Sequence, residues 1–368
     1  MSVALGVAGT AKNTGKTTAL AGLMGEGVAR GWRMGLTSIG FDGEEVDNIT
    51  GLPKPRLFVE RGIIVATAGR CVEASTASLK VIGDTPVESP LGRVMVAEVQ
   101  RPGLVVLAGP VKSGDLRVVL DDMRRRRCLD IVLVDGAFAR ISPMVEADAL
   151  ILATGAARNP DIESLAVETE AVVRVLGLPQ EKEMSALSVD KLFVGYAGGE
   201  VRGCAIRSVL TMRDAAALRE CLLKWKDAGR VQRVFIPGAV NPALLLRIVT
   251  GTGDVLKGAK VVFADPLKLL VCGDPASAAS ALRWMKDSYI SVAVSRAIRL
   301  LGITVNPFYP VRLATGAYEP HFVDAVRLAE VLRARTGVKV WDVVLGGTEE
   351  IGTAVEEVIV GRRRFSQA

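Results

Sequence analysis

Short apolar runs alternate with segments of helical spacing along most of this chain. The runs span roughly four to eight residues and are rich in Val, Ile and Leu, which predicts strands buried on both faces, as a parallel sheet requires. Such runs occur on both sides of a stretch between Gln180 and Asp190, where charge interrupts the pattern. For 368 residues we therefore expect an α/β protein with two domains, residues 1–185 and 186–368.

The first domain is predicted to begin with a strand, a glycine-containing loop and a helix. Further strands are expected at 33–39, 130–134 and 149–153, and helices at 17–30, 114–126 and 162–176. Between about residues 56 and 109 the pattern is extended, with Arg101-Pro102-Gly103 typical of a hairpin turn. We interpret this region as a β-rich insertion in the sheet or an antiparallel edge of it.

The second domain repeats the alternation of strands and helices, which favours a second α/β layer structure. Strands are expected at 191–196, 201–206, 233–236, 260–264, 303–305 and 338–345. Helices are expected at 215–225, 242–249, 276–286, 292–300 and 320–335. The single histidine, His321, falls at the start of the last helix and is interpreted as a surface or packing residue.

The most specific motif lies between the first strand and the first helix. It reads Gly9-Thr10-Ala11-Lys12-Asn13-Thr14-Gly15-Lys16-Thr17-Thr18 and has the form of a phosphate-binding loop. In such a loop, backbone N–H groups and the positive end of the helix surround a phosphate, Lys16 reaches the outer oxygens, and the Thr17 hydroxyl binds Mg²⁺. The alternative is a chance Gly-Lys-Thr at an ordinary helix start. The predicted nucleotide-binding residues are Gly9, Thr10, Lys12, Asn13, Thr14, Gly15, Lys16, Thr17 and Thr18.

Lys12 has two interpretations. Some dimeric ATPases carry an extra loop lysine that reaches the nucleotide of the partner subunit, although that position corresponds to Ala11 in this sequence. The alternative is an exposed lysine that helps to bind phosphate.

Two carboxylates are candidates for metal binding. Asp135 follows an apolar strand and is predicted to hold Mg²⁺, the alternative being a cap on the turn at Gly136. Asp42 follows the second strand and is predicted to bind metal or to position water, the alternative being an Asp42-Gly43 turn. Lys16 and Asp42 are therefore the predicted catalytic residues, and Thr17, Asp135 and Asp42 the predicted metal ligands.

Two further glycine-containing segments are weaker candidates. Residues 154–160 follow a strand and precede a helix, so they are candidates for contact with the base or with a second anion. Residues 237–242 have a similar outline in the second domain and are a candidate ligand or partner site. An ordinary loop explains residues 154–160 equally well, and residues 237–242 are the leading candidate for a second ligand or partner site.

The loop resembles the G-T-D-x-x-x-G-K-T loop of dethiobiotin synthetases, and Val134-Asp135-Gly136-Ala137 resembles their V-E-G-A segment. This resemblance implies a P-loop NTPase of the dimerising branch that binds ATP and Mg²⁺, and a ligase or kinase reaction on a small carboxylate. The lysine on the second strand of that family has no counterpart in Met34-Gly35-Leu36-Thr37-Ser38-Ile39, and this chain is longer. The difference puts the family's reaction in doubt for this chain.

A second resemblance extends over most of the chain, to the ATPase-like reactivating subunit of adenosylcobalamin-dependent lysine 5,6-aminomutase. It rests on the loop and on Ile39-Gly40-Phe41-Asp42-Gly43-Glu44-Glu45, Pro53-Lys54-Pro55-Arg56 and Gly302-Ile303-Thr304-Val305-Asn306-Pro307. It implies ATP-driven release of damaged cobalamin, with the aminomutase and a second reactivase subunit as partners. Our leading hypothesis is a Mg²⁺-dependent ATPase; the ligase and a nucleotide-binding regulator that does not hydrolyse ATP stay open.

Charge and cysteine content bear on nucleic-acid and metal binding and on the expected location. The net charge is +6, but the basic residues are spread along the chain, and Arg124-Arg125-Arg126-Arg127 is interpreted as a solvated helix end. Arg362-Arg363-Arg364 is interpreted as a solubilising tail. The five cysteines are far apart in sequence, which favours neither zinc nor iron–sulfur binding. We expect a reducing, cytoplasmic location and no nucleic-acid or membrane partner.

Overall fold

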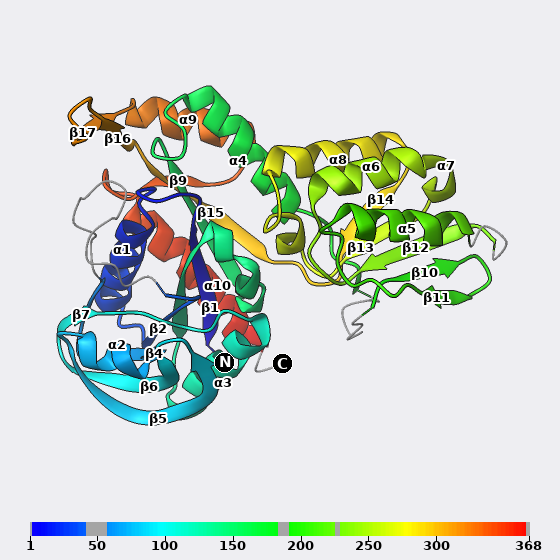
Figure 1. Ribbon diagram of the computed structural model, residues 1–368. Helices are drawn as coiled ribbons and strands as arrows, with labels where there is room; N and C mark the ends of the chain where they lie inside the picture. The colour runs from blue at the N-terminus through cyan, green and yellow to red at the C-terminus, as the bar shows by residue number, and fades with distance from the viewer. Residues whose placement is uncertain (1, 42–56, 183–190, 225–228, 366–368) are drawn as a thin grey trace. The chain divides into compact units, whose positions relative to one another are not determined.

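The chain forms two compact units (Figure 1). The computed structural model describes residues 2–41, 57–182, 191–224 and 229–365. Unit 1 consists of Met1–Ala166 and Leu300–Ala368, and unit 2 of Val167–Arg299. The predicted division at residue 185 therefore differs from the observed one. It assumed that each domain is one continuous stretch, whereas the last part of the chain returns to the unit that contains the N-terminus.

Unit 1 is built on a nine-stranded sheet. In order across the sheet its strands are β18 (Val340–Asp342), β15 (Arg299–Asn306), β9 (Ala149–Gly155), β1 (Val3–Gly9), β8 (Ile131–Ala137), β2 (Met34–Ser38), β4 (Ile64–Ala68), β6 (Gly92–Arg101) and β5 (Ser78–Ser89). β1 pairs in parallel with β8 and β9, and β2 pairs in parallel with β8 and β4. These central strands are continuous apolar runs because helices cover both of their faces.

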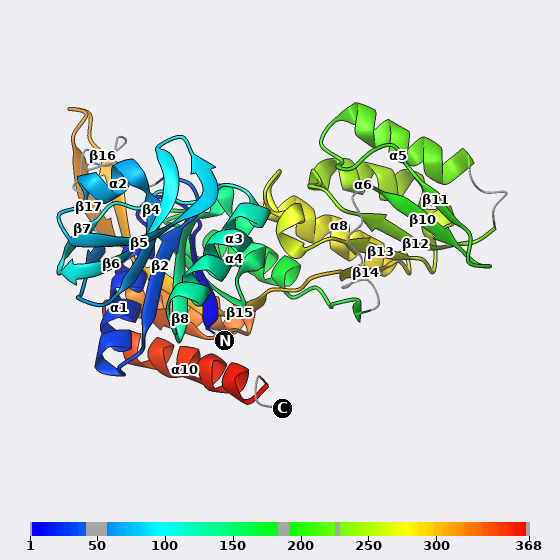
Figure 2. The ribbon, with the colours of Figure 1, turned by 90° about the horizontal axis from the view of Figure 1, so that it is seen from below.

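Helices pack on both faces of this sheet (Figure 2). Leu20 and Leu23 of α1 (Lys16–Ala29) share a core with Val355 of α10 (Thr348–Phe365) and with alternate residues of β1. Met123 of α3 (Ser113–Arg126) lies against the opposite face beside Gly35. Each fully buried aliphatic side chain stabilises such a core by about 1.5–3 kcal/mol. The prediction of an α/β architecture is confirmed.

The β-rich region forms an antiparallel edge of the sheet. β6 pairs antiparallel with both β4 and β5, and α2 (Gly69–Ala74) lies between β4 and β5 in the chain. β3 (Leu57–Val59) and β7 (Gly103–Val105) form a separate two-stranded sheet. The predicted hairpin at Arg101-Pro102-Gly103 is therefore wrong, because the strands on either side of Pro102 pair with different partners.

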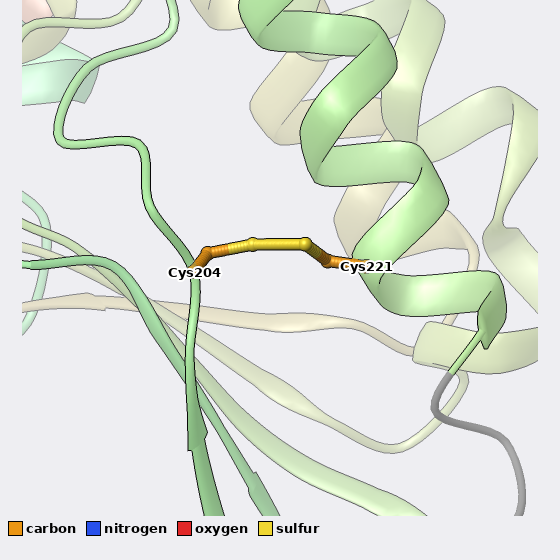
Figure 3. Close-up of a disulfide and its surroundings, with 2 residues drawn as sticks. All are labelled: Cys204 and Cys221. Atoms are coloured by element: carbon orange, nitrogen blue, oxygen red, sulfur yellow. A yellow bond between two sulfur atoms is a disulfide. The ribbon is translucent and has the colours of Figure 1, made fainter.

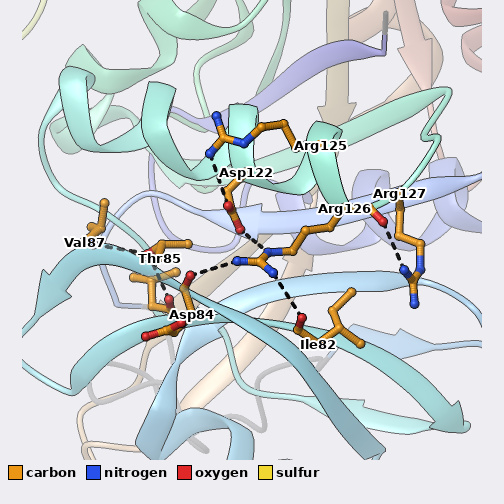
Figure 4. Close-up of polar contacts among 9 residues, drawn as sticks. Ile82, Asp84, Thr85, Val87, Asp122, Arg125, Arg126 and Arg127 are labelled. Carbon is orange, nitrogen blue, oxygen red and sulfur yellow. Dashed lines mark hydrogen bonds and ion pairs between the residues drawn. The ribbon is translucent and has the colours of Figure 1, made fainter.

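The arginines at the end of α3 connect that helix to the edge strand (Figure 4). Arg126 donates to Asp122 and to the backbone carbonyls of Ile82 and Asp84, at 2.5, 3.1 and 3.1 Å. Arg127 pairs with Glu98 at 2.8 Å. The prediction of a simply solvated helix end is corrected, since these guanidinium groups hold β5 and β6 to the helix.

The last part of the chain completes unit 1. After β15 come a hairpin, β16 (Phe308–Arg312) and β17 (Tyr318–Phe322), then α9 (Ala325–Thr336), β18 and α10. His321 lies on β17 rather than on a helix, with Nε2 3.4 Å from Glu319. The predicted helix at 320–335 thus begins too early. The presumed basic tail belongs to α10, where Arg362 pairs with Asp148.

Unit 2 is a second α/β body, as predicted. Its sheet contains, in order, β11 (Val201–Gly203), β10 (Phe193–Tyr196), β12 (Val231–Ile236), β13 (Lys260–Phe263) and β14 (Ser291–Val294). Its longer helices are α5 (Met212–Lys224), α6 (Pro242–Gly251) and α8 (Pro275–Asp287), and α4 (Ile162–Leu176) begins in unit 1. The last three strands run parallel, and Asn241 and Asp274 cap α6 and α8. The helix predicted at 292–300 is wrong, because this segment holds the end of β14 and the start of β15.

A disulfide joins Cys204, just after β11, to Cys221 on α5 (Figure 3). Cys71, Cys128 and Cys272 are free thiols, and burial raises the pKa of Cys71. The sequence did not predict this pairing, because a separation of 17 residues forms no recognisable motif. Disulfides are rare in reducing compartments, so this bond counts against the reducing location expected from the sequence.

Candidate functional site

The loop between β1 and α1 has the backbone shape of an anion-binding loop. Asn13 and Gly15 adopt left-handed conformations with φ of 62° and 81°, and α1 begins at Lys16. A β-carbon on Gly9 would lie 3.2 Å from both the Lys16 β-carbon and the Thr14 hydroxyl, so the loop folds tightly over Gly9. The first turn of α1 contains no acidic residue, and the capping position, Gly15, has no side chain. The positive end of the helix therefore faces the loop with no carboxylate in its own first turn.

Threonines fix the loop to its neighbours. Thr10 donates its hydroxyl to Thr154 at 2.9 Å, and its backbone N–H donates to Ala153 at 2.9 Å. Buried Thr14 donates to the carbonyl of Ala11 at 2.9 Å. The unusual Gly9-Thr10 pair thus has a structural reason: glycine is needed where the loop folds back, and the next residue ties the loop to β9. Thr154 of the 154–160 segment therefore contacts this loop, and a contact of the segment with a base or a second anion stays a prediction.

Lys16 and Asp135 meet at the opening of the loop. The lysine Nζ lies 3.0 Å from Oδ1 and 3.1 Å from Oδ2 of Asp135. Only 12% of the lysine side chain and 8% of the aspartate side chain are exposed. The parallel register pairs Val7 of β1 with Asp135 of β8, which places the carboxylate beside the strand that leads into the loop. The fold therefore brings Lys16 and Asp135 into contact, although they lie 119 positions apart in the sequence.

The other predicted site residues lie differently. Thr17 is half-buried in the first turn of α1, whereas Lys12 and Thr18 are exposed. Asp42 lies outside the described residues, so its proposed role stays a prediction. In the 237–242 segment the backbone N–H of Gly238 donates to Arg207, and Asn241 caps α6. A ligand or partner role for this segment stays a prediction.

Asn306 is a residue of the site that was not among the predicted ones. It ends β15, and its Nδ2 donates to the backbone carbonyl of Asn13 at 2.8 Å. Its own carbonyl accepts from the N–H of Ala156 at 2.9 Å. The signal in the sequence was the position of an asparagine directly after an apolar run, which is where parallel strands deliver functional side chains.

The donor set fits Mg²⁺ bound together with a phosphate. Magnesium is commonly held in proteins by one or two oxygen ligands, with waters and phosphate oxygens completing the octahedron. Thr17 and Asp135 are ligands of this type, and Lys16 is a point charge suited to phosphate. Within the described residues, no group of three or more His, Cys, Asp or Glu side chains is arranged to hold a metal by itself.

Comparison with protein-family models, with curated proteins and with solved structures gave no match. None of the helices within the described ranges is long and apolar enough to cross a membrane.

Proposed function

We propose that this chain is a Mg²⁺-dependent ATPase whose turnover remodels a partner protein. The observation that carries the proposal is the loop itself: left-handed Asn13 and Gly15, an uncapped helix start, and the Lys16–Asp135 pair at its opening. The resemblance to the reactivating subunit of an adenosylcobalamin-dependent aminomutase supplies the proposed partner. The choice of adenine over guanine is part of the proposal, and no Asn-Lys-x-Asp or Thr-Lys-x-Asp segment in the sequence favours guanine.

Lys16 and Asp135 each have a natural partner in a metal–triphosphate. The ammonium group would turn from the carboxylate to the outer phosphate oxygens, and the carboxylate and the Thr17 hydroxyl would hold the metal. Bound Mg²⁺ would neutralise phosphate charge and orient the terminal phosphoryl group. The loop N–H groups and Lys16 would stabilise charge on the transferred group, which is the main contribution that a protein makes to phosphoryl transfer.

One observation disfavours the ligase. β2, Met34–Ser38, is buried along its whole length and contains no lysine, whereas the dethiobiotin synthetases carry a lysine on their second strand. The Ser38 hydroxyl donates to the carbonyl of Gly40 at 3.0 Å. This strand therefore provides no cation for a carboxylate substrate.

ATP turnover with Mg²⁺ distinguishes the candidate functions. It is measured for the chain alone, with a purified cobalamin-dependent aminomutase, and with a panel of free carboxylic acids. We expect turnover that rises with the aminomutase. Turnover that rises only with a carboxylic acid would support the ligase, and ATP binding without turnover in any mixture would support a regulatory protein.

A Lys16→Met variant tests the site. Hydrogen bonds to charged groups contribute about 1.5–3 kcal/mol each, so we expect ATP affinity to fall by roughly a hundredfold in calorimetry. Lys80→Met is the matched control, because it removes the same charge from an exposed residue of β5. Equal affinity in the two variants would contradict the assignment of the loop.

A further inference from the structure

Asn306 contacts the phosphate loop although 293 positions separate it from Asn13. Its amide orientation is unambiguous: Oδ1 accepts from the N–H of Phe308 at 3.2 Å, and Nδ2 donates to the Asn13 carbonyl at 2.8 Å. A β-carbon on Gly15 would lie 3.2 Å from the β-carbon of Asn306. The asparagine thus packs against the loop and is hydrogen bonded at both ends of its amide.

The bond to Asn13 acts where the loop backbone is left-handed. Residues other than glycine rarely adopt a positive φ, and Asn13 has a φ of 62°. The carbonyl of Asn13 and the N–H of Thr14 belong to one planar trans peptide and point in opposite directions. Fixing the carbonyl therefore fixes the direction of the Thr14 N–H.

We propose that Asn306 is a positioning residue that holds Asn13 to Gly15 in the shape in which their N–H groups face a bound phosphate. The inference rests on the proposed nucleotide-binding function. The anchor is itself secured at the end of β15: its carbonyl accepts from Ala156 after β9, and its Oδ1 holds the start of β16. The loop and the β16–β17 hairpin therefore share one anchoring side chain.

Two substitutions test this role. Asn306→Ala removes the donor, and we expect ATP affinity to fall about tenfold, the effect of losing one hydrogen bond and its orientation. Asn306→Asp is nearly isosteric, but a carboxylate repels the Asn13 carbonyl, so at pH 8 its affinity should fall further, about thirtyfold. A carboxyl group that faces a carbonyl oxygen protonates more readily than in water, and its O–H then donates as the amide did. At pH 5 the deficit of the Asp variant relative to the wild type should shrink to that of the Ala variant or less.

Asn241→Asp is the matched control, because it makes the same change in unit 2 and leaves an acceptor for the Ala243 and Leu244 N–H groups. A second readout needs no nucleotide: hydrogen exchange of residues 10–16 should be faster in Asn306→Ala than in the wild type. Unchanged loop exchange, affinity within twofold of the wild type, or an Asp-variant deficit equal at both pH values would overturn the inference. Failure of the wild-type protein to bind ATP would instead overturn the proposed function.

Discussion

Replacing Lys16 with Met tests how strongly the Lys16–Asp135 pair stabilises unit 1. At 3.0 Å the gross attraction is about 5.5 kcal/mol for an effective dielectric constant of about 20. Removing one partner of a buried pair lowers stability by about 3–5 kcal/mol, since the other charge stays buried without its counterion. Because 12% and 8% of the two side chains are exposed, some hydration remains. We expect a loss of about 3 kcal/mol, at the lower end of that range.

A double-mutant cycle isolates the pair from other effects of the substitution. The free energy of unfolding is measured in urea for the wild type, Lys16→Met, Asp135→Asn and the double variant. Because the second change removes the charge that the first leaves behind, the double variant should be more stable than the sum of the single losses predicts, by about 1–3 kcal/mol. Hydrogen exchange in β1 and β8 shows whether the loss lies in unit 1.

Lys80→Met, on the exposed side of β5, controls for the loss of a positive charge. A coupling energy below about 0.5 kcal/mol would refute the reasoning, because the effects of two independent substitutions add to within about that amount. So would equal stability of the Lys16 and Lys80 variants. A confirmed loss means that a lysine substitution in this loop changes folding as well as binding.

Three further predictions concern the rest of the fold. Cys221→Ser opens the disulfide to Cys204, which spans 17 residues, and should lower the unfolding free energy of unit 2 by about 3 kcal/mol in urea; dithiothreitol should have the same effect on the wild type but none on the variant. Burial raises the pKa of Asp265, so ionisation of this carboxyl group destabilises the folded state as the pH rises above about 4. Asp265→Asn should therefore raise Tm at pH 7 and change it little at pH 4. An unchanged or lower Tm at pH 7 would contradict this prediction. Arg126→Ala removes the bonds from α3 to β5 and should destabilise unit 1 by about 2 kcal/mol, with faster hydrogen exchange in β5 and unchanged ATP affinity.

The strand, the turn and the helix start around residues 9–18 could be predicted because the loop's shape is set locally. The loop comprises the end of a strand, two residues in left-handed conformations and the start of a helix, all within a short stretch. Each of these features has a recognisable pattern in the sequence. Asp135 could also be placed, since a carboxylate near the end of an apolar strand meets the carboxyl ends of its parallel neighbours. The two α/β bodies followed from the alternation of apolar runs and helical spacing.

The errors came from contacts between distant segments. The periodicity of residues 292–300 fits a helix or a strand, and the first of these residues form a strand because β14 pairs with β13. Arg126 has the composition of a solvated helix end, but its partners Ile82 and Asp84 lie on another element. α10 did leave a signal, since apolar residues at 351, 355 and 359 recur at helical spacing and share a core with α1. The basic residues 362–364, which lie in the last turn of the same helix, were interpreted as a separate tail.

The discontinuity of unit 1 has a consequence for the protein during its synthesis. Asn13, in the loop between β1 and α1, is synthesised 293 positions before Asn306, the side chain that anchors the loop. β15, β18 and α10 also follow unit 2 in the chain, so the sheet and the core around α1 are completed only after unit 2 has been made. A nascent or truncated chain that stops within unit 2 carries the motif at residues 9–18 without the side chain that holds it. In this fold, the loop is anchored only once synthesis has passed through unit 2 and reached the end of β15.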